Sequence, residues 1–115
     1  MIVDNERTTA SLIQTLLELD GFEVSIVGRG MQVAVRARQN PPDVFLLDYR
    51  LDDIEGTEVT RRLRAIPEFA HTPIVMSSGL NVADEAYAAG ASLFLIKPFE
   101  PSQLSGILNR LITPH

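Results

Sequence analysis

Five short apolar runs alternate along this chain with five segments that have the period of an amphipathic helix, and this alternation strongly constrains the fold. Strands that alternate with helices predict right-handed crossovers and a parallel sheet covered on both faces. The expected strands are residues 1–3, 22–27, 44–47, 74–77 and 93–96, and the expected helices are residues 8–20, 30–39, 57–65, 82–89 and 101–112. The pattern therefore predicts an α/β domain of (βα)5 type, a three-layer sandwich around a five-stranded parallel sheet.

Length and composition favour a single domain over residues 1–115, with no linker, repeat or low-complexity segment. The absence of cysteine excludes disulfides and thiolate metal sites, and it fits a cytoplasmic protein. No apolar run approaches the roughly 18 residues of a membrane span. The formal net charge is -5 and no Lys/Arg-rich patch is present. We therefore expect neither a membrane nor a nucleic acid as a direct partner.

Four polar residues come at the ends of four of the apolar runs: Asp4, Asp48, Ser78 and Lys97. If the runs are parallel strands of one sheet, these side chains meet at its carboxyl edge, where ligands bind in open α/β sheets. Ser77 is the neighbouring alternative to Ser78, but strand alternation places the two serines on opposite faces. Two carboxylates, a hydroxyl and an ammonium group together indicate metal-assisted phosphoryl chemistry on an aspartate.

Four segments, in order and each at a strand end, resemble a response-regulator receiver domain of two-component signalling, and the resemblance covers essentially the whole chain. They are Ile2-Val3-Asp4-Asn5-Glu6, Leu46-Leu47-Asp48-Tyr49-Arg50-Leu51 through Gly56, Pro73 to Gly79, and Gly90 to Phe99 with its Lys97-Pro98 pair. The resemblance implies a flavodoxin-like fold with strand order 2-1-3-4-5. It also implies a signalling domain, not an enzyme, whose only chemistry is its own phosphorylation and dephosphorylation.

Within this resemblance, Asp48 is the expected phosphoacceptor, with a sensor histidine kinase or a phosphotransfer protein as donor. The expected Mg²⁺ ligands are Asp4, Asn5, Asp48 and the backbone carbonyl of Arg50, since hard cations prefer oxygen. Ser78 would contact the phosphoryl group, and Lys97 would pair first with the Asp48 carboxylate and then with a phosphoryl oxygen. Ser78 and Phe94 would form the conformational switch. The resemblance also implies a cis Lys97–Pro98 bond.

Asn5 departs from the family pattern, because receivers usually carry a second acid at this position. An amide offers a carbonyl oxygen but no charge, so the sequence predicts weaker Mg²⁺ binding and slower phosphorylation. Glu6 would compensate only if its side chain turned inward. Asp52 stands where the family often has proline. Together with Asp53 and Glu55 it is expected to form a solvated acidic loop.

Asn5 also motivates an alternative function, a degenerate receiver that acts as a phosphate-independent protein-interaction module. An aspartyl-phosphate hydrolase would want a second acid where Arg50 stands. Flavin binding would want a phosphate-cradling loop after the first strand, which Asn5-Glu6-Arg7 does not provide. The resemblance implies a partner surface for an output domain or a homodimer, formed by the segments 82–89, 93–96 and 101–112.

Overall fold

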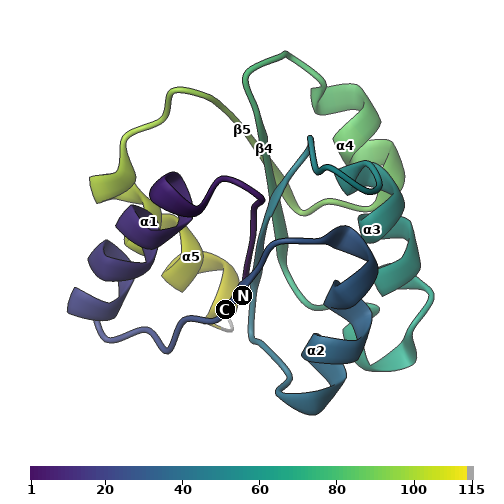
Figure 1. The fold of residues 1–115 in the computed structure, drawn as a ribbon, viewed down its shortest axis with the longest axis horizontal. Coiled ribbons are helices and arrows are strands. Elements are labelled where there is room, and N and C mark those ends of the chain that lie inside the picture. Colours follow the sequence, from purple (N-terminus) through teal and green to yellow (C-terminus); the bar gives the residue numbers. More distant parts are fainter. Residues whose placement is uncertain (114–115) are drawn as a thin grey trace.

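The computed structural model describes residues 1–113 and confirms a five-stranded parallel sheet in the order β2-β1-β3-β4-β5 (Figure 1). The strands are β1 (Ile2–Val3), β2 (Ile26–Val27), β3 (Phe45–Asp48), β4 (Ile74–Ser78) and β5 (Leu93–Ile96). The α-helices are α1 (Arg7–Leu19), α2 (Val33–Gln39), α3 (Gly56–Arg64), α4 (Ala83–Ala89) and α5 (Pro101–Ile112), with 3-10 helices η1 (Gly30–Gln32) and η2 (Pro67–Phe69). Within residues 1–113, no helix is both long enough and apolar enough to cross a membrane.

Two layers of helices enclose the sheet, as the alternation predicts (Figure 1). Helices α1 and α5 cover one face and α2, α3 and α4 cover the other. The core under α1 and α5 includes Ile13, Leu17, Leu104 and Leu108, and the core under the other helices includes Val33, Val59, Leu63 and Ala86. Each helix thus buries one apolar stripe on the sheet, which is the main source of stability for short helices.

The central strand β4 shows why the strand sequences are continuously apolar. Ile74 and Met76 enter the core under α2, α3 and α4, whereas Val75 enters the core under α1 and α5. All three side chains are fully buried, because helices cover both faces of this strand. The same alternation directs the side chains of Ser77 and Ser78, at the end of β4, to opposite faces.

Several boundaries differ from those expected. The second strand spans only Ile26–Val27 instead of residues 22–27, because β1 offers just two residues for it to pair with. The segment expected as one helix over 30–39 begins with the 3-10 turn η1 before α2. Helix α3 begins at Gly56 instead of residue 57, and the 3-10 helix η2 is an element that the apolar pattern does not predict. Asp48 and Ser78 are the last residues of their strands.

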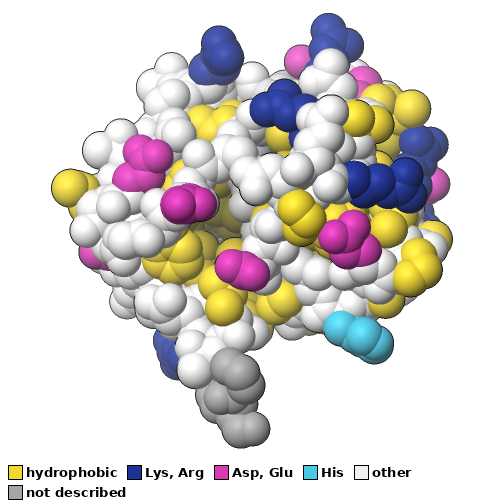
Figure 2. Space-filling model, turned by 90° about the horizontal axis from the view of Figure 1, so that it is seen from below, with side chains coloured by type: hydrophobic (Ala, Val, Ile, Leu, Met, Phe, Trp, Pro, Cys, Tyr) yellow, Lys and Arg dark blue, Asp and Glu magenta, His cyan; other side chains and the backbone are white. Residues whose placement is uncertain are grey.

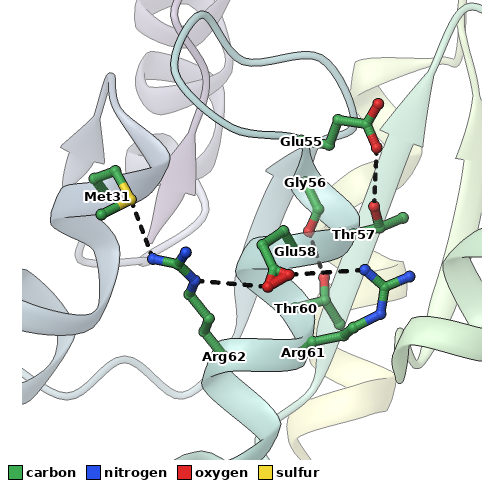
Figure 3. A network of polar contacts seen from close by, with 8 residues as sticks. All are labelled: Met31, Glu55, Gly56, Thr57, Glu58, Thr60, Arg61 and Arg62. Carbon is green, nitrogen blue, oxygen red and sulfur yellow. Dashed lines mark hydrogen bonds and ion pairs between the residues drawn. The ribbon is translucent and has the colours of Figure 1, made fainter.

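Charged side chains on α3 form a surface network that faces away from the sheet (Figure 3). Glu58 lies 3.8 Å from Arg61 and 3.7 Å from Arg62, and all three side chains are at least two-fifths exposed. Exposed ion pairs of this kind contribute roughly 0–1 kcal/mol. Arg62 also donates to the sulfur of Met31, at 3.1 Å, which links α3 to η1. The network therefore connects α3 to η1 and makes the exposed surface of α3 polar.

Candidate functional site

All four polar residues expected at the carboxyl edge of the sheet lie there, and three of them share one hollow. Asp4 follows β1, Asp48 ends β3 and Lys97 follows β5, and all three line one small hollow of about 10 Å³. Ser77, which pairs with Asp48 in the β3–β4 register, lines the same hollow. The strands bring these residues together because parallel strands present their carboxyl ends at one edge.

Asp48 and Lys97 form an ion pair inside this site, with 3.4 Å between Lys97 Nζ and Asp48 Oδ2. Burial raises the pKa of Asp48, and the charge of Asp4 adds to this rise, while Lys97 opposes it. The charge of Lys97 acts on Asp48 more strongly than the charge of Asp4 does, so the net rise in the pKa of Asp48 comes from the burial of its carboxylate. A hard cation bound by oxygen ligands fits this charge arrangement.

Asp4 is buried, with 7% of its surface exposed. Its Oδ1 accepts the backbone N–H of Glu6 at 2.9 Å, so the carboxylate also shapes the turn from β1 into α1. This burial argues against an ordinary solvated acid at the start of a loop. Among residues 1–113, no buried side-chain nitrogen or oxygen lacks a hydrogen-bond partner.

The two residues after Asp4 are exposed, and each has a hydrogen-bond partner of its own. Asn5 is exposed, and its Nδ2 donates to Oδ1 of Asp52 at 2.8 Å. Glu6 is not turned inward: it is exposed, and its Oε1 accepts the hydroxyl of Thr9 at 2.7 Å. Within the described residues, no group of three His, Cys, Asp or Glu side chains is placed to hold a metal.

The loop after Asp48 is held close to the sheet by its two ends. The N–H of Tyr49 donates to the carbonyl of Ser77 at 2.9 Å, and the N–H of Gly56 donates to the carbonyl of Tyr49 at 2.8 Å. A Cβ at position 56 would collide with the Asp48 carbonyl oxygen, so the loop can close this tightly only on glycine. A backbone hydrogen bond from Arg50 to the Asp48 carboxylate works against the raised pKa of Asp48.

Ser78 lies at the same edge but on the other side of β4. It is buried, and its Oγ accepts the N–H of Leu80 at 3.0 Å. Phe94, on β5, is half-buried and packs against the core under α2, α3 and α4, the side toward which the side chain of Ser78 is directed. The N–H of Phe94 donates to the hydroxyl of Tyr87 on α4 at 3.1 Å. The structure therefore puts Ser78 and Phe94 on the α4 side, and Ser77 beside Asp48.

The acidic loop expected to be solvated does expose Asp52 and Glu55, and its acidic residues also have specific hydrogen-bond partners. Asp53 accepts the backbone N–H groups of Gly30 and Met31 at 2.9 and 2.8 Å, and these bonds, that from Met31 foremost, lower the pKa of Asp53. Glu55 accepts the hydroxyl of Thr57 at 3.4 Å (Figure 3). The contact of Asp53 with η1 joins loops more than 20 residues apart, and no local sequence pattern signals it.

A larger hollow lies at the opposite edge of the sheet, visible in the view from below (Figure 2). It measures about 650 Å³ and is lined by residues at the amino ends of the strands, among them Met1, Ser25, Asp43 and Val44. None of the polar residues at the carboxyl edge lines it. It is therefore separate from the site built around Asp48.

Comparisons with known proteins agree with this geometry. The family model of the response regulator receiver domain matches residues 1–109. The phosphate regulon transcriptional regulatory protein PhoB of Rhizobium meliloti is 34% identical over 106 residues, which cover 90% of this chain and 47% of that protein. The chain thus spans about half the length of this relative and of others like it.

Two solved structures show the same fold. Chemotaxis protein CheY4 of Vibrio cholerae is 26% identical, with a TM-score of 0.88 over 96% of this chain and 94% of that one. The receiver domain of sensor histidine kinase PA1611 from Pseudomonas aeruginosa PAO1 is 30% identical, with a TM-score of 0.87 over 96% and 93% of the two chains. That crystal structure has a magnesium ion coordinated in its active-site cleft.

Proposed function

The chain belongs to the response regulator receiver domain family, and on that premise we propose that residues 1–115 form the phosphoacceptor domain of a two-component phosphorelay, with Asp48 as the residue phosphorylated. The observation that carries the proposal is the pairing of Asp48 with Lys97, 3.4 Å apart, beside the buried Asp4. The donor would be the phosphohistidine of a sensor kinase or of a phosphotransfer protein. The domain signals through this modification and turns over no separate substrate.

In the proposed transfer, a carboxylate oxygen of Asp48 forms a bond to phosphorus as the bond from phosphorus to the donor imidazole nitrogen breaks. The ammonium group of Lys97 can move from the Asp48 oxygen to a phosphoryl oxygen, and it would stabilise the negative charge there. The half-buried position of Asp48 limits competing water at the carboxylate. The catalytic contribution of the chain is therefore positioning and charge stabilisation.

The residues that would hold Mg²⁺ are Asp4, Asp48, Asn5 and the backbone carbonyl of Arg50. A bound divalent cation supplies the positive charge that lets an anionic carboxylate approach an anionic phosphoryl group. Burial raises the pKa of Asp48 and the nearby charge of Asp4 adds to this rise, so two carboxylates that repel each other support a cation at this place. Because Asn5 is neutral, we expect the site to bind Mg²⁺ more weakly than it would with a third carboxylate in this position.

The conformational change caused by phosphorylation would begin at Ser78 and extend to α4 and β5. A phosphoryl group on Asp48 would draw the Ser78 hydroxyl away from the N–H of Leu80, and Phe94 would adjust on the same side of the sheet. Tyr49 donates its hydroxyl to Glu85 on α4 at 3.0 Å, which gives the site a second link to that helix. Phosphorylation would bias an existing equilibrium between two arrangements of this region.

The surface that changes would serve a partner, either an output domain or a second copy of the chain. Tyr87 on α4 and Ile96 on β5 are each about half exposed, as is Leu80 in the loop before α4, which suits an interface on the α4–β5–α5 face. A phosphate-independent interaction module is the second candidate function. The observation that favours it is the exposed Asn5, since no third acidic side chain joins Asp4 and Asp48 among the described residues.

Amide NMR spectra with Mg²⁺, recorded before and after addition of beryllofluoride, test the two candidates against each other. The phosphoacceptor proposal expects shifts centred on Asp48, Ser78 and Lys97 that spread to Phe94, and their loss in Asp48→Asn. Radiolabelling with a small phosphodonor should likewise depend on Asp48 and on Mg²⁺. Asp48 would be excluded as phosphoacceptor if the wild-type spectrum did not change with Mg²⁺ or beryllofluoride and one of two labelling results accompanied it. Either Asp48→Asn would be labelled as fully as the wild type, or the wild type would not be labelled at all.

A further inference from the structure

The contact between Asn5 and Asp52 joins the loop after β1 to the loop after β3. Nδ2 of Asn5 donates to Oδ1 of Asp52 at 2.8 Å, across 47 positions of sequence, and both residues are exposed. Asn5 directly follows the buried Asp4, and Asp52 follows Arg50 in the loop that Gly56 closes. An acidic side chain is therefore hydrogen-bonded to the one side chain of the proposed cation set that lacks a charge.

The chemistry of this hydrogen bond determines which end of the Asn5 amide faces Asp52. An asparagine side chain has a donor end and an acceptor end, whereas an ionised carboxylate only accepts. The reversed amide would set its carbonyl oxygen against the carboxylate of Asp52 and lose the bond. Asp52 thus keeps Nδ2 engaged and leaves Oδ1, the atom of this side chain that can bind a hard cation, free to do so.

Asp52 also places a negative charge next to Asn5, the position where the family usually has an acid. Asp4 and Asp48 supply two carboxylates there, and Lys97 cancels part of their charge. The carboxylate of Asp52 lies one hydrogen bond beyond the amide of Asn5, so it acts on a bound cation from a greater distance than a ligand would. Partners in this outer position orient the ligands and typically change metal affinity by about 10–100-fold.

We propose that Asp52 is a positioning residue of the cation site, which orients the neutral Asn5 amide toward a divalent cation and supplies the charge that Asn5 lacks. The inference rests on the proposed function, because it needs a cation between Asp4, Asn5 and Asp48. It assigns Asp52 no contact with the phosphoryl group. It explains how a site with an amide in place of an acid can retain affinity for Mg²⁺.

The test is a set of Mg²⁺ titrations followed by backbone amide NMR. Asp52→Ala should weaken Mg²⁺ binding by about tenfold, the lower end of the outer-partner range. Asp52→Asn, which retains an acceptor oxygen but no charge, should weaken it less. Glu55→Ala removes the same charge from the same loop at a side chain that contacts Thr57 (Figure 3), and it should leave the Kd within about twofold of wild type.

A second comparison separates orientation from general stability. Asn5→Asp should tighten Mg²⁺ binding, because a carboxylate has two equivalent oxygens and needs no partner to orient it. In that background Asp52→Ala should weaken binding much less than it does in the wild type, so the two substitutions should be strongly non-additive. The side-chain amide signals of Asn5 should also shift in Asp52→Ala before any Mg²⁺ is added, and melting curves will show whether the variants fold.

The outcomes distinguish this inference from the proposed function. If wild type binds Mg²⁺ and Asp52→Ala binds it equally well, the assignment of Asp52 is wrong and the phosphoacceptor proposal stands. Equal losses in Asp52→Ala and Glu55→Ala would also overturn it, because they would show a general charge effect. If wild type shows no Mg²⁺ binding while Asn5→Asp does, both the cation site of the natural sequence and the role of Asp52 fall.

Discussion

Lys97 reaches Asp48 across an intervening strand: its Nζ lies 3.4 Å from Asp48 Oδ2, although β4 separates β3 from β5 in the sheet. The N–H of Lys97 donates to the carbonyl of Ser78 at 2.8 Å, which anchors the lysine backbone to the end of β4. The following Lys97–Pro98 peptide bond is cis, as the resemblance implied. With its backbone anchored at the end of β4, Lys97 extends its side chain over the carboxyl edge toward Asp48.

We predict that Lys97→Ala slows phosphorylation of Asp48 on the order of a hundredfold, the effect of losing one preorganised electrostatic partner. Initial labelling rates with a small phosphodonor measure it. Arg7→Ala, which removes a positive charge from an exposed residue at the start of α1, is the matched control and should label at the wild-type rate. Since Lys97 is the only lysine in the chain, its Nζ NMR signal can also be followed alone. An unchanged labelling rate would remove Lys97 from the transfer.

We predict that Asp48→Asn is more stable than wild type at neutral pH. The pKa of Asp48 is raised from 3.8 in the folded state, chiefly by burial, so between 3.8 and the folded value the folded protein binds more protons than the unfolded one. Stability therefore falls as pH rises through that window, and the ionised carboxylate remains unfavourable above it. Melting temperatures across acidic to neutral pH should show the advantage of Asp48→Asn shrinking in acid. A constant difference at every pH would contradict this.

Ser78→Ala and Ser77→Ala should have different effects on the switch, although both serines are buried. We expect Ser78→Ala to lose about 1 kcal/mol of beryllofluoride affinity, a factor of about five, and to weaken the shifts at Phe94 and Tyr87. Ser77→Ala should keep those shifts, because its side chain lies on the opposite face. Titration with beryllofluoride at saturating Mg²⁺ measures both. The reverse pattern would identify Ser77, beside Asp48, as the functional hydroxyl.

Asp53→Ala should destabilise the fold without affecting phosphorylation of Asp48. Asp53 accepts two N–H groups at the start of η1, and losing such a cap costs about 1 kcal/mol. The melting temperature should fall by roughly 4 °C. The pKa of Asp53 is lowered from 3.8, so this contribution is present above 3.8 and is lost as pH falls through the folded pKa. Glu55→Ala should melt close to wild type, and an equal loss there would contradict the capping role.

Much of the fold could be predicted from the sequence because its elements have local signatures. Residues 93–96 and 101–112 form β5 and α5 with the expected bounds, since apolar period and the flanking Pro101 act within a few residues. The strand order came from family resemblance, not from periodicity. The length of β2 could not be predicted, because it depends on how many residues of β1 face it.

The sequence by itself determined which residues end the strands, and a parallel sheet then brings Asp4, Asp48 and Lys97 to one edge. Only the tertiary structure decided that Ser77 lies beside Asp48, that Asp53 caps η1 and that Asp52 holds Asn5. The physical reason is the distance along the sequence over which each interaction acts. Periodicity and breakers act over a few residues, whereas these contacts join loops whose approach depends on the closed packing of the whole sheet and its helices.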